Sequence, residues 1–410
     1  MEFPLHYFEG NLMFTPDKVC WGFYELKGFQ IDYKSVDMRK RQFRRLLGLF
    51  WSIDKSARLL FLPEDHTFSE HFEGVKDSVT GPFKETTLQY ADMATEWLEQ
   101  TFDKNGAFRY RMFLSLKISE DPKFWDSIKN IKDFVVKMAK EPKQKVDRTL
   151  GLSGLEIPGE DLRLLRDIEE RVYSRISKYA AMERAEEHTV EWAVRRNFWK
   201  GISAPPQRFV WSKQRLGARP KSKNTEGIRV KTSRRAADRI VVGDKEYIRP
   251  RTAEFMPLTE GEVDLKKNPR MVAITHTVGT EKITSYTAYL IMSDKPDELS
   301  VPGDEFIYNL HEIDFPVGLS MSIEPMPYQE VKGKLLGKKK EIEDQTEHTA
   351  SSDEELPLNL QQAQREAQYL EKDLDDSKFP MFDVSLVFEV TALDEKTLWE
   401  RVDALVDFYK

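Results

Sequence analysis

The clearest hydrophobic pattern in the chain is a strand followed by a helix, and it occurs twice. Residues 382–391 alternate apolar and more polar positions, the period of a half-buried strand, and residues 394–409 carry one apolar helical face. The apolar strand positions are Val384, Leu386, Phe388 and Val390. Residues 108–139 repeat the arrangement. Each copy has a tryptophan in its first helical turn, Trp125 and Trp399, which we expect to be buried against its own sheet.

Two such copies predict an α+β fold of two related ferredoxin-like halves, each a split β-α-β unit, joined by a helical and basic insertion. The expected parts are a first half (1–140), a helical segment (141–203), a basic linker or small β insertion (204–269) and a second half (270–410). The sequence stops at Lys410, before the strand that would complete the second unit. We therefore expect a second half without its final strand, in an N-terminal piece of a longer protein.

The same patterns predict the remaining elements. Apolar alternation or continuous apolar runs indicate a central strand within the opening stretch 11–26 and further strands at 57–62, 271–278, 284–292 and 317–324. Apolar residues three or four apart indicate helices after Asp37, at 88–102, from Glu160 for up to 40 residues, at 304–312 and at 360–374. Gly243-Asp244 predicts a hairpin turn, and residues 66–83 and 332–356 read as a loop and a charged linker.

Composition narrows the class of protein. The chain has 410 residues, 40% of them hydrophobic, with 63 basic and 70 acidic residues, so the molecule as a whole is not a general polyanion binder. The single cysteine, Cys20, lies in an apolar run, which favours a core residue and excludes a disulfide within the chain. No run approaches the roughly 18 apolar residues of a membrane helix. These features predict a cytoplasmic setting.

Motifs for catalysis are weak in this sequence. A phosphate-binding loop needs G-x-x-x-x-G-K-[ST], and the nearest stretch, residues 333–338, has its glycines one residue too close and Lys339 in place of the hydroxyl residue. His66, Glu70 and His71 could hold zinc only if folding brought them together, and surface histidines are the favoured interpretation. His276 is interpreted as a packed or edge histidine. We therefore predict no catalytic, cofactor or metal site in this chain.

The strongest local signal is a basic segment, residues 208–251, with fourteen basic residues against four acidic ones. It could contact nucleic-acid phosphates or anionic lipid headgroups, and a solvated insertion remains the alternative. The basic face of the helix after Asp37 leaves the same two interpretations open. The candidate polyanion contacts are Arg208, Lys213, Arg215, Arg219, Lys221, Lys223, Arg229, Lys231, Arg234, Arg235 and Arg239.

Two ends of the chain resemble a known family. The opening LHYFEGNLMFTPDKVCWGFYELKGF and the terminal FDVSLVFEVTALDEKTLWERV are similar to the N-terminal domain of the VirB-type (CagE/TrbE-like) ATPases of type IV secretion and conjugation, in their Gram-positive form. The resemblance follows the order of elements over the whole chain and is specific only at these two stretches. Family members continue into a motor domain that carries the phosphate loop.

The resemblance implies an interaction or docking domain that is not catalytic in this fragment. The parent protein would be an ATPase powering DNA or protein transfer, with ATP and magnesium bound by the motor domain. It also implies docking onto secretion-channel subunits at the inner face of the cell membrane, peripheral attachment there, and oligomers formed through the parent protein. The alternative from another class is a nucleic-acid-binding module acting through residues 208–251.

Overall fold

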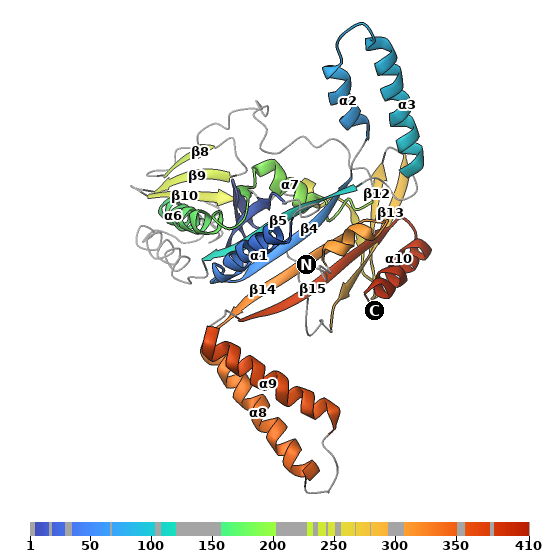
Figure 1. Ribbon diagram of the computed structural model, residues 1–410. Helices are drawn as coiled ribbons and strands as arrows, with labels where there is room; N and C mark the ends of the chain where they lie inside the picture. The colour runs from blue at the N-terminus through green and yellow to red at the C-terminus, as the bar shows by residue number, and fades with distance from the viewer. Residues whose placement is uncertain are drawn as a thin grey trace.

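The computed structural model describes residues 5–15, 19–28, 35–65, 68–102, 108–119, 157–201, 228–232, 237–242, 245–250, 256–266, 268–278, 280–293, 307–350, 357–377 and 381–409. An 11-stranded sheet forms the centre of the molecule (Figure 1). Every strand pair in it is antiparallel. The prediction of a mixed α+β fold is therefore confirmed.

The order of strands in this sheet reads as two mirrored halves. The order is β1-β2-β3-β5-β4 followed by β14-β15-β13-β12-β11, and β7 (Met182–Arg184) pairs with β3. The first half contributes β1 (Tyr7–Glu9), β2 (Leu12–Phe14), β3 (Cys20–Leu26), β4 (Ala57–Asp65) and β5 (Phe108–Ser119). The second contributes β11 (Glu262–Asp264), β12 (Val272–Val278), β13 (Glu281–Ile291), β14 (Val317–Met326) and β15 (Met381–Ala392).

The two halves join edge to edge through β4 and β14. Phe61 lies opposite Leu319 and Leu59 opposite Met321 in this register. Apolar residues on both sides of the joint belong to one core cluster, which also includes Leu114 of β5 and Phe388 of β15. The joint is thus a continuous ladder with a shared core.

A helical hairpin is inserted at the same position in each half. Helices α2 (Phe68–Ser78) and α3 (Lys84–Phe102) lie between β4 and β5, and α8 (Tyr328–Ala350) and α9 (Leu358–Ser377) lie between β14 and β15. Asp65 is the cross-strand partner of Phe108, and Met326 that of Met381, so each hairpin spans the ends of two paired strands. The α2–α3 arm projects at the top of Figure 1 and the α8–α9 arm at the bottom.

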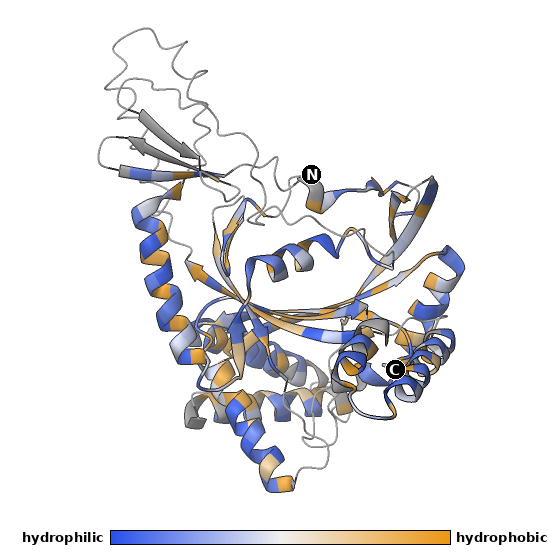
Figure 2. Ribbon diagram, turned by 90° about the horizontal axis from the view of Figure 1, so that it is seen from above, coloured by the Kyte–Doolittle hydropathy of each residue, from blue (hydrophilic) through white to orange (hydrophobic). Residues whose placement is uncertain are grey.

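The other helices cover the sheet. These are α1 (Val36–Trp51), α6 (Gly159–Ile176), α7 (Glu187–Arg195), η2 (Met256–Thr259), η3 (Tyr308–Glu312) and α10 (Glu395–Phe408). Hydrophobic residues concentrate along the strands, whereas the helices carry both hydrophobic and hydrophilic residues (Figure 2). A small second sheet has the order β6-β10-β9-β8 and lies beside α6. Its strands are β6 (Ile157–Pro158), β8 (Ile228–Thr232), β9 (Ala237–Val242) and β10 (Lys245–Pro250).

Many predicted elements are confirmed. Helix α10 begins after Asp394, as predicted, and the Asp394 carboxylate caps it by accepting a hydrogen bond from the Thr397 N–H. The helix predicted after Asp37 is present but begins one residue before it, at Val36, and its cap is Ser35. Strands β9 and β10 pair antiparallel with Val242 opposite Lys245, whereas residues 243–244, where the hairpin turn was predicted, lie outside the described residues. Trp399, which was expected to be buried, is only partly buried: it packs against the core shared by the two halves, where its neighbour Leu398 takes the fully buried position. Trp125 and the helix predicted around it lie outside the described residues.

Three predictions of local structure are wrong. Residues predicted as a loop at 66–83 include helix α2, which is stabilised by packing on α3. The helix predicted from Glu160 ends at Ile176, because residues 182–184 leave the helical path to pair with β3. The charged linker at 332–356 is mostly helix α8, because its sparse apolar residues, such as Leu335 and Ile342, face α9 in a core of their own.

Candidate functional site

A turn of five residues after α7 holds the sheet halves together. Backbone N–H groups of residues 196–199 donate to carbonyls three or four residues earlier, which continues the helix as a tight turn. Gly201 follows with a φ of 65°, a left-handed conformation that favours glycine. We call residues 196–200 the junction turn.

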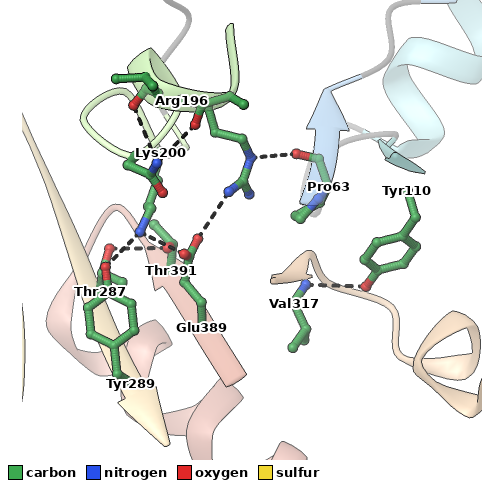
Figure 3. Close-up of polar contacts among 12 residues, drawn as sticks. Pro63, Tyr110, Arg196, Lys200, Thr287, Tyr289, Val317, Glu389 and Thr391 are labelled. Atoms are coloured by element: carbon green, nitrogen blue, oxygen red, sulfur yellow. Dashed lines mark hydrogen bonds and ion pairs between the residues drawn. The ribbon is translucent and has the colours of Figure 1, made fainter. Parts of the chain in front are cut away.

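Arg196 of the junction turn contacts both halves. Its Nε donates to the carbonyl of Pro63 on β4 at 2.9 Å, and its Nη1 donates to Oε1 of Glu389 on β15 at 3.5 Å (Figure 3). A guanidinium group offers several donors in a fixed plane, so one side chain can hold two strands at once. Arg196 therefore bridges the joint on the face that α7 covers.

Lys200 completes the cluster from the other end of the turn. Its Nζ lies 2.8 Å from Oε2 of Glu389 and donates to the hydroxyl of Tyr289 on β13 at 2.9 Å (Figure 3). The Lys200 side chain is only 3% exposed and that of Glu389 13%. Burial alone would raise the pKa of Glu389, but the charges of Lys200 and Arg196 outweigh it and hold the pKa below its usual value. The carboxylate is thus ionised, and each of its oxygens is paired with a cation, Oε1 with Arg196 and Oε2 with Lys200.

Two of the three residues between these cations, Phe198 and Trp199, contact a fourth strand, β12. The imidazole Nε2–H of His276 on β12 donates to the carbonyl of Phe198 at 2.6 Å, and its ring stacks on Trp199 with centroids 3.8 Å apart. His276 is buried, which confirms its interpretation as a packed histidine. Across residues 196–200 the junction turn therefore contacts β4, β15, β13 and β12.

A further contact across the joint lies close by. The Tyr110 hydroxyl on β5 accepts a hydrogen bond from the Val317 backbone N–H at 3.4 Å (Figure 3). Burial raises the pKa of Tyr110 to about 12, so this hydroxyl stays protonated near neutral pH. Tyr110 also packs edge-on against His311. The joint is therefore held by specific polar contacts in addition to the ladder.

A second buried network ties α6 to the first half. Glu169 accepts hydrogen bonds from Asn11 at 3.0 Å and from Arg184 at 2.9 Å. Burial raises the pKa of Tyr24 and of the Cys20 thiol, and the nearby Glu169 carboxylate adds to both shifts. Cys20 is buried in the core, as predicted, and its thiol stays in the unreactive protonated form.

One carboxyl group in α7 is buried without a described hydrogen-bond partner. Glu191 has no exposed surface, and neither of its carboxyl oxygens forms a hydrogen bond with the described residues. Burial, helped by the Glu187 carboxylate one turn earlier, raises the pKa of Glu191 to about 7, and the Arg195 charge opposes the shift. This side chain can therefore change its charge near neutral pH.

These polar groups form structural clusters. The cations of the junction turn are paired with Glu389, and in the described part of the chain no group of three or more His, Cys, Asp or Glu residues could hold a metal ion. Among the described helices, none is long and apolar enough to cross a membrane. The contacts of Arg196 and Lys200 with Glu389 and Pro63 hold one half of the sheet against the other.

The surface offers a different kind of candidate site. The α2–α3 arm exposes Phe83, Tyr90, Met93 and Trp97, each by more than 60%. Leu88, Ala91, Thr95 and Leu98 of α3 are less exposed, and Ala91 and Thr95 are buried. The two sets lie on different faces of α3, so the arm buries one side and leaves an apolar stripe on another.

The predicted site residues are only partly placed. Arg208, Lys213, Arg215, Arg219, Lys221, Lys223, Arg234 and Arg235 lie outside the described residues. Arg229 and Lys231 lie on β8 and Arg239 on β9, where Lys231 and Arg239 are direct backbone partners. Their role as polyanion contacts stays a prediction. The glycine stretch at 333–338 lies within α8, and the zinc candidate cannot be assessed because His66 lies outside the described residues.

The junction residues were missed by the sequence analysis. Glu389 was grouped with the polar positions of a half-buried strand, and that interpretation of its face is wrong, because the junction turn covers it. The signal that could have found it is an acidic residue within a strongly apolar strand, with two cations in a tryptophan-rich segment elsewhere.

The chain matches no protein-family model, and no curated protein shows significant sequence similarity to it.

Proposed function

We propose that this chain is an interaction module that positions partner proteins, and that it is the N-terminal docking domain of a type IV secretion or conjugation ATPase. The observation that carries the proposal is the pair of helical arms at equivalent positions of two mirrored sheet halves. Each arm contacts mainly itself, and at least one exposes large apolar side chains. Exposed apolar stripes on soluble proteins typically mark interaction sites.

We further propose that the halves are ferredoxin-like. In the first half, β3 and β4 are connected through α1 and flank β5, which follows them in sequence. In the second half, β13 and β14 flank β15 in the same manner, with η3 in the connection. A split β-α-β unit has this order. The short β7 beside β3 stands where a fourth strand of the first unit belongs.

In this proposal the fragment positions the partner proteins, and the motor domain of the parent protein hydrolyses ATP. The junction turn is central to it, since an arm can transmit force or position only if the sheet behind it is rigid. Buried clusters with paired charges, such as Lys200 and Arg196 with Glu389, favour one arrangement of the strands that they join. Partners are expected to be secretion-channel subunits at the inner face of the cell membrane.

The test removes each arm separately. Residues 66–107 or 327–380 are replaced by a short Gly-Ser loop, which the paired strand ends allow, and binding to purified secretion-channel subunits is measured by interferometry. Loss of binding with a folded sheet supports the proposal, and Lys396→Ala on α10 is the control that should bind normally. The proposal would be contradicted if both armless variants bound the subunits as strongly as the unmodified chain does, or if the unmodified chain did not bind them at all.

A further inference from the structure

Helix α1 carries an exposed surface that complements α3. Its Val36, Phe43 and Leu47 side chains are 55%, 41% and 37% exposed. Only Leu49 in this helix is buried, with Leu46 and Phe50 partly buried beside it. Residues 36, 43 and 47 recur at helical spacing beside Phe50, so they form an apolar stripe along the exposed margin of the face that packs on the sheet.

The charges beside the two stripes are opposite. Helix α1 contains five basic residues and one acidic residue, whereas α3 contains four acidic residues and one basic residue. Exposed Lys40 and Arg44 lie one turn from Phe43 and Leu47 in α1, and exposed Glu96 lies one turn from Met93 in α3. The helices have 16 and 19 residues, about 24 and 28 Å at 1.5 Å per residue, so their lengths match.

The two helices belong to different parts of the molecule. Helix α1 packs on the sheet, through contacts such as Phe50 with Phe382 of β15, whereas α3 stands in the projecting arm (Figure 1). A contact between α1 of one copy and α3 of another would bury both stripes and pair their charges. Because the two surfaces differ, the contact is head-to-tail, and each copy keeps one free surface for the next copy.

We propose that the partner of the α2–α3 arm is α1 of a second copy of this chain. The inference rests on the proposed docking role. It specifies that the α2–α3 arm docks onto another copy of this chain. Two helices bury a small interface, so the association of isolated chains is weak, with a dissociation constant on the order of micromolar. Part of the attraction is ionic and exposed, so the association weakens with salt.

Sedimentation velocity of the full chain over a range of concentrations tests the inference. The unmodified chain should form dimers and larger species as its concentration rises. Trp97→Ser with Met93→Ser should remove the α3 surface, and Phe43→Ser with Arg44→Glu the α1 surface. Each double variant alone should sediment as a monomer at the concentrations where the unmodified chain associates. Its dissociation constant for self-association should rise at least about tenfold, as expected when central aromatic anchors are lost.

Mixing the two double variants gives the sharpest result. Each retains the surface that the other lacks, so the mixture should form a one-to-one dimer and no larger species. Circular dichroism of each variant establishes that it is folded, and Tyr369→Ser on the exposed face of α9 is the matched control that should assemble normally.

A monomeric unmodified chain at all concentrations, or larger species in the mixture, overturns the inference. Anionic vesicles of phosphatidylglycerol serve as a rival partner, and binding to them through α1 by a monomeric chain also overturns it. Failure here with binding to channel subunits intact leaves the proposed function standing. Self-assembly without any subunit binding leaves the inference standing and removes the proposed function.

Discussion

The Lys200 Nζ lies 2.8 Å from the Glu389 carboxylate, although the two residues are far apart in sequence and both side chains are almost completely buried. Lys200 belongs to the junction turn, and Glu389 belongs to β15, which lies between β14 and β13 in the second half. Removing one member of a buried ion pair leaves the other charge without compensation, which costs far more than the loss of a surface pair.

We predict that Glu389→Gln destabilises the fold by about 3–5 kcal/mol, because Lys200 and Arg196 stay buried without their counter-charge. Thermal unfolding followed by circular dichroism should show a melting temperature lower by several degrees. The control is Glu400→Gln, which breaks the exposed i,i+4 pair with Lys396 and should change little. A melting temperature equal to that of the control would show that the junction turn does not stabilise the sheet.

The raised pKa of Glu191 predicts a specific dependence of stability on pH. With a folded-state pKa of about 7 and an ordinary value of 4.5, the folded state binds more protons than the unfolded state between these values. The stability contribution of this group is therefore present below about pH 4.5 and is lost as the pH rises to about 7. Glu191→Gln should melt at a higher temperature than the unmodified chain at pH 8, and the difference should shrink towards pH 5.

Exposed Glu262→Gln on β11 is the comparison variant for Glu191, and its melting temperature should follow that of the unmodified chain at both pH values. If Glu191→Gln behaves in the same way, the carboxyl group is not held in an environment that favours its neutral form.

We predict that this chain does not hydrolyse ATP. The glycine stretch at 333–338 lies inside α8, where backbone N–H groups are used in helical hydrogen bonds and cannot cradle phosphates. Phosphate release with magnesium and ATP should equal that of buffer, and Lys338→Ala should leave it unchanged. Turnover that survives repurification and disappears in Lys338→Ala would disprove this.

The basic segment predicts salt-dependent binding of a polyanion. If its residues contact phosphates, replacing Arg234, Arg235 and Arg239 by alanine should reduce the slope of log affinity against log salt, because fewer counterions are released. Single-stranded DNA and anionic vesicles are titrated separately at two salt concentrations. Binding to DNA alone favours a nucleic-acid module, and binding to neither ligand supports a solvated insertion. Lys338→Ala on α8, outside the segment, is the control for nonspecific charge loss.

The sequence by itself determined the elements whose signals are local. Strand β15 and helix α10 follow from alternation and from the cap at Asp394, whose carboxylate accepts the Thr397 N–H at 2.9 Å. The period of apolar residues and the capping group act within one or two turns, so they can be recognised without knowing the rest of the fold.

Tertiary structure decided which faces are covered and which strands are neighbours. The sequence could not show that Glu389 lies under the junction turn, because a charged residue in a strand indicates solvent until the covering segment is placed. Helix α8 was missed for a related reason: its few apolar residues gain their stability by packing against α9 and not from their own periodicity. The joint between β4 and β14 is a pairing of residues more than 250 positions apart, and such pairing leaves no trace in local spacing.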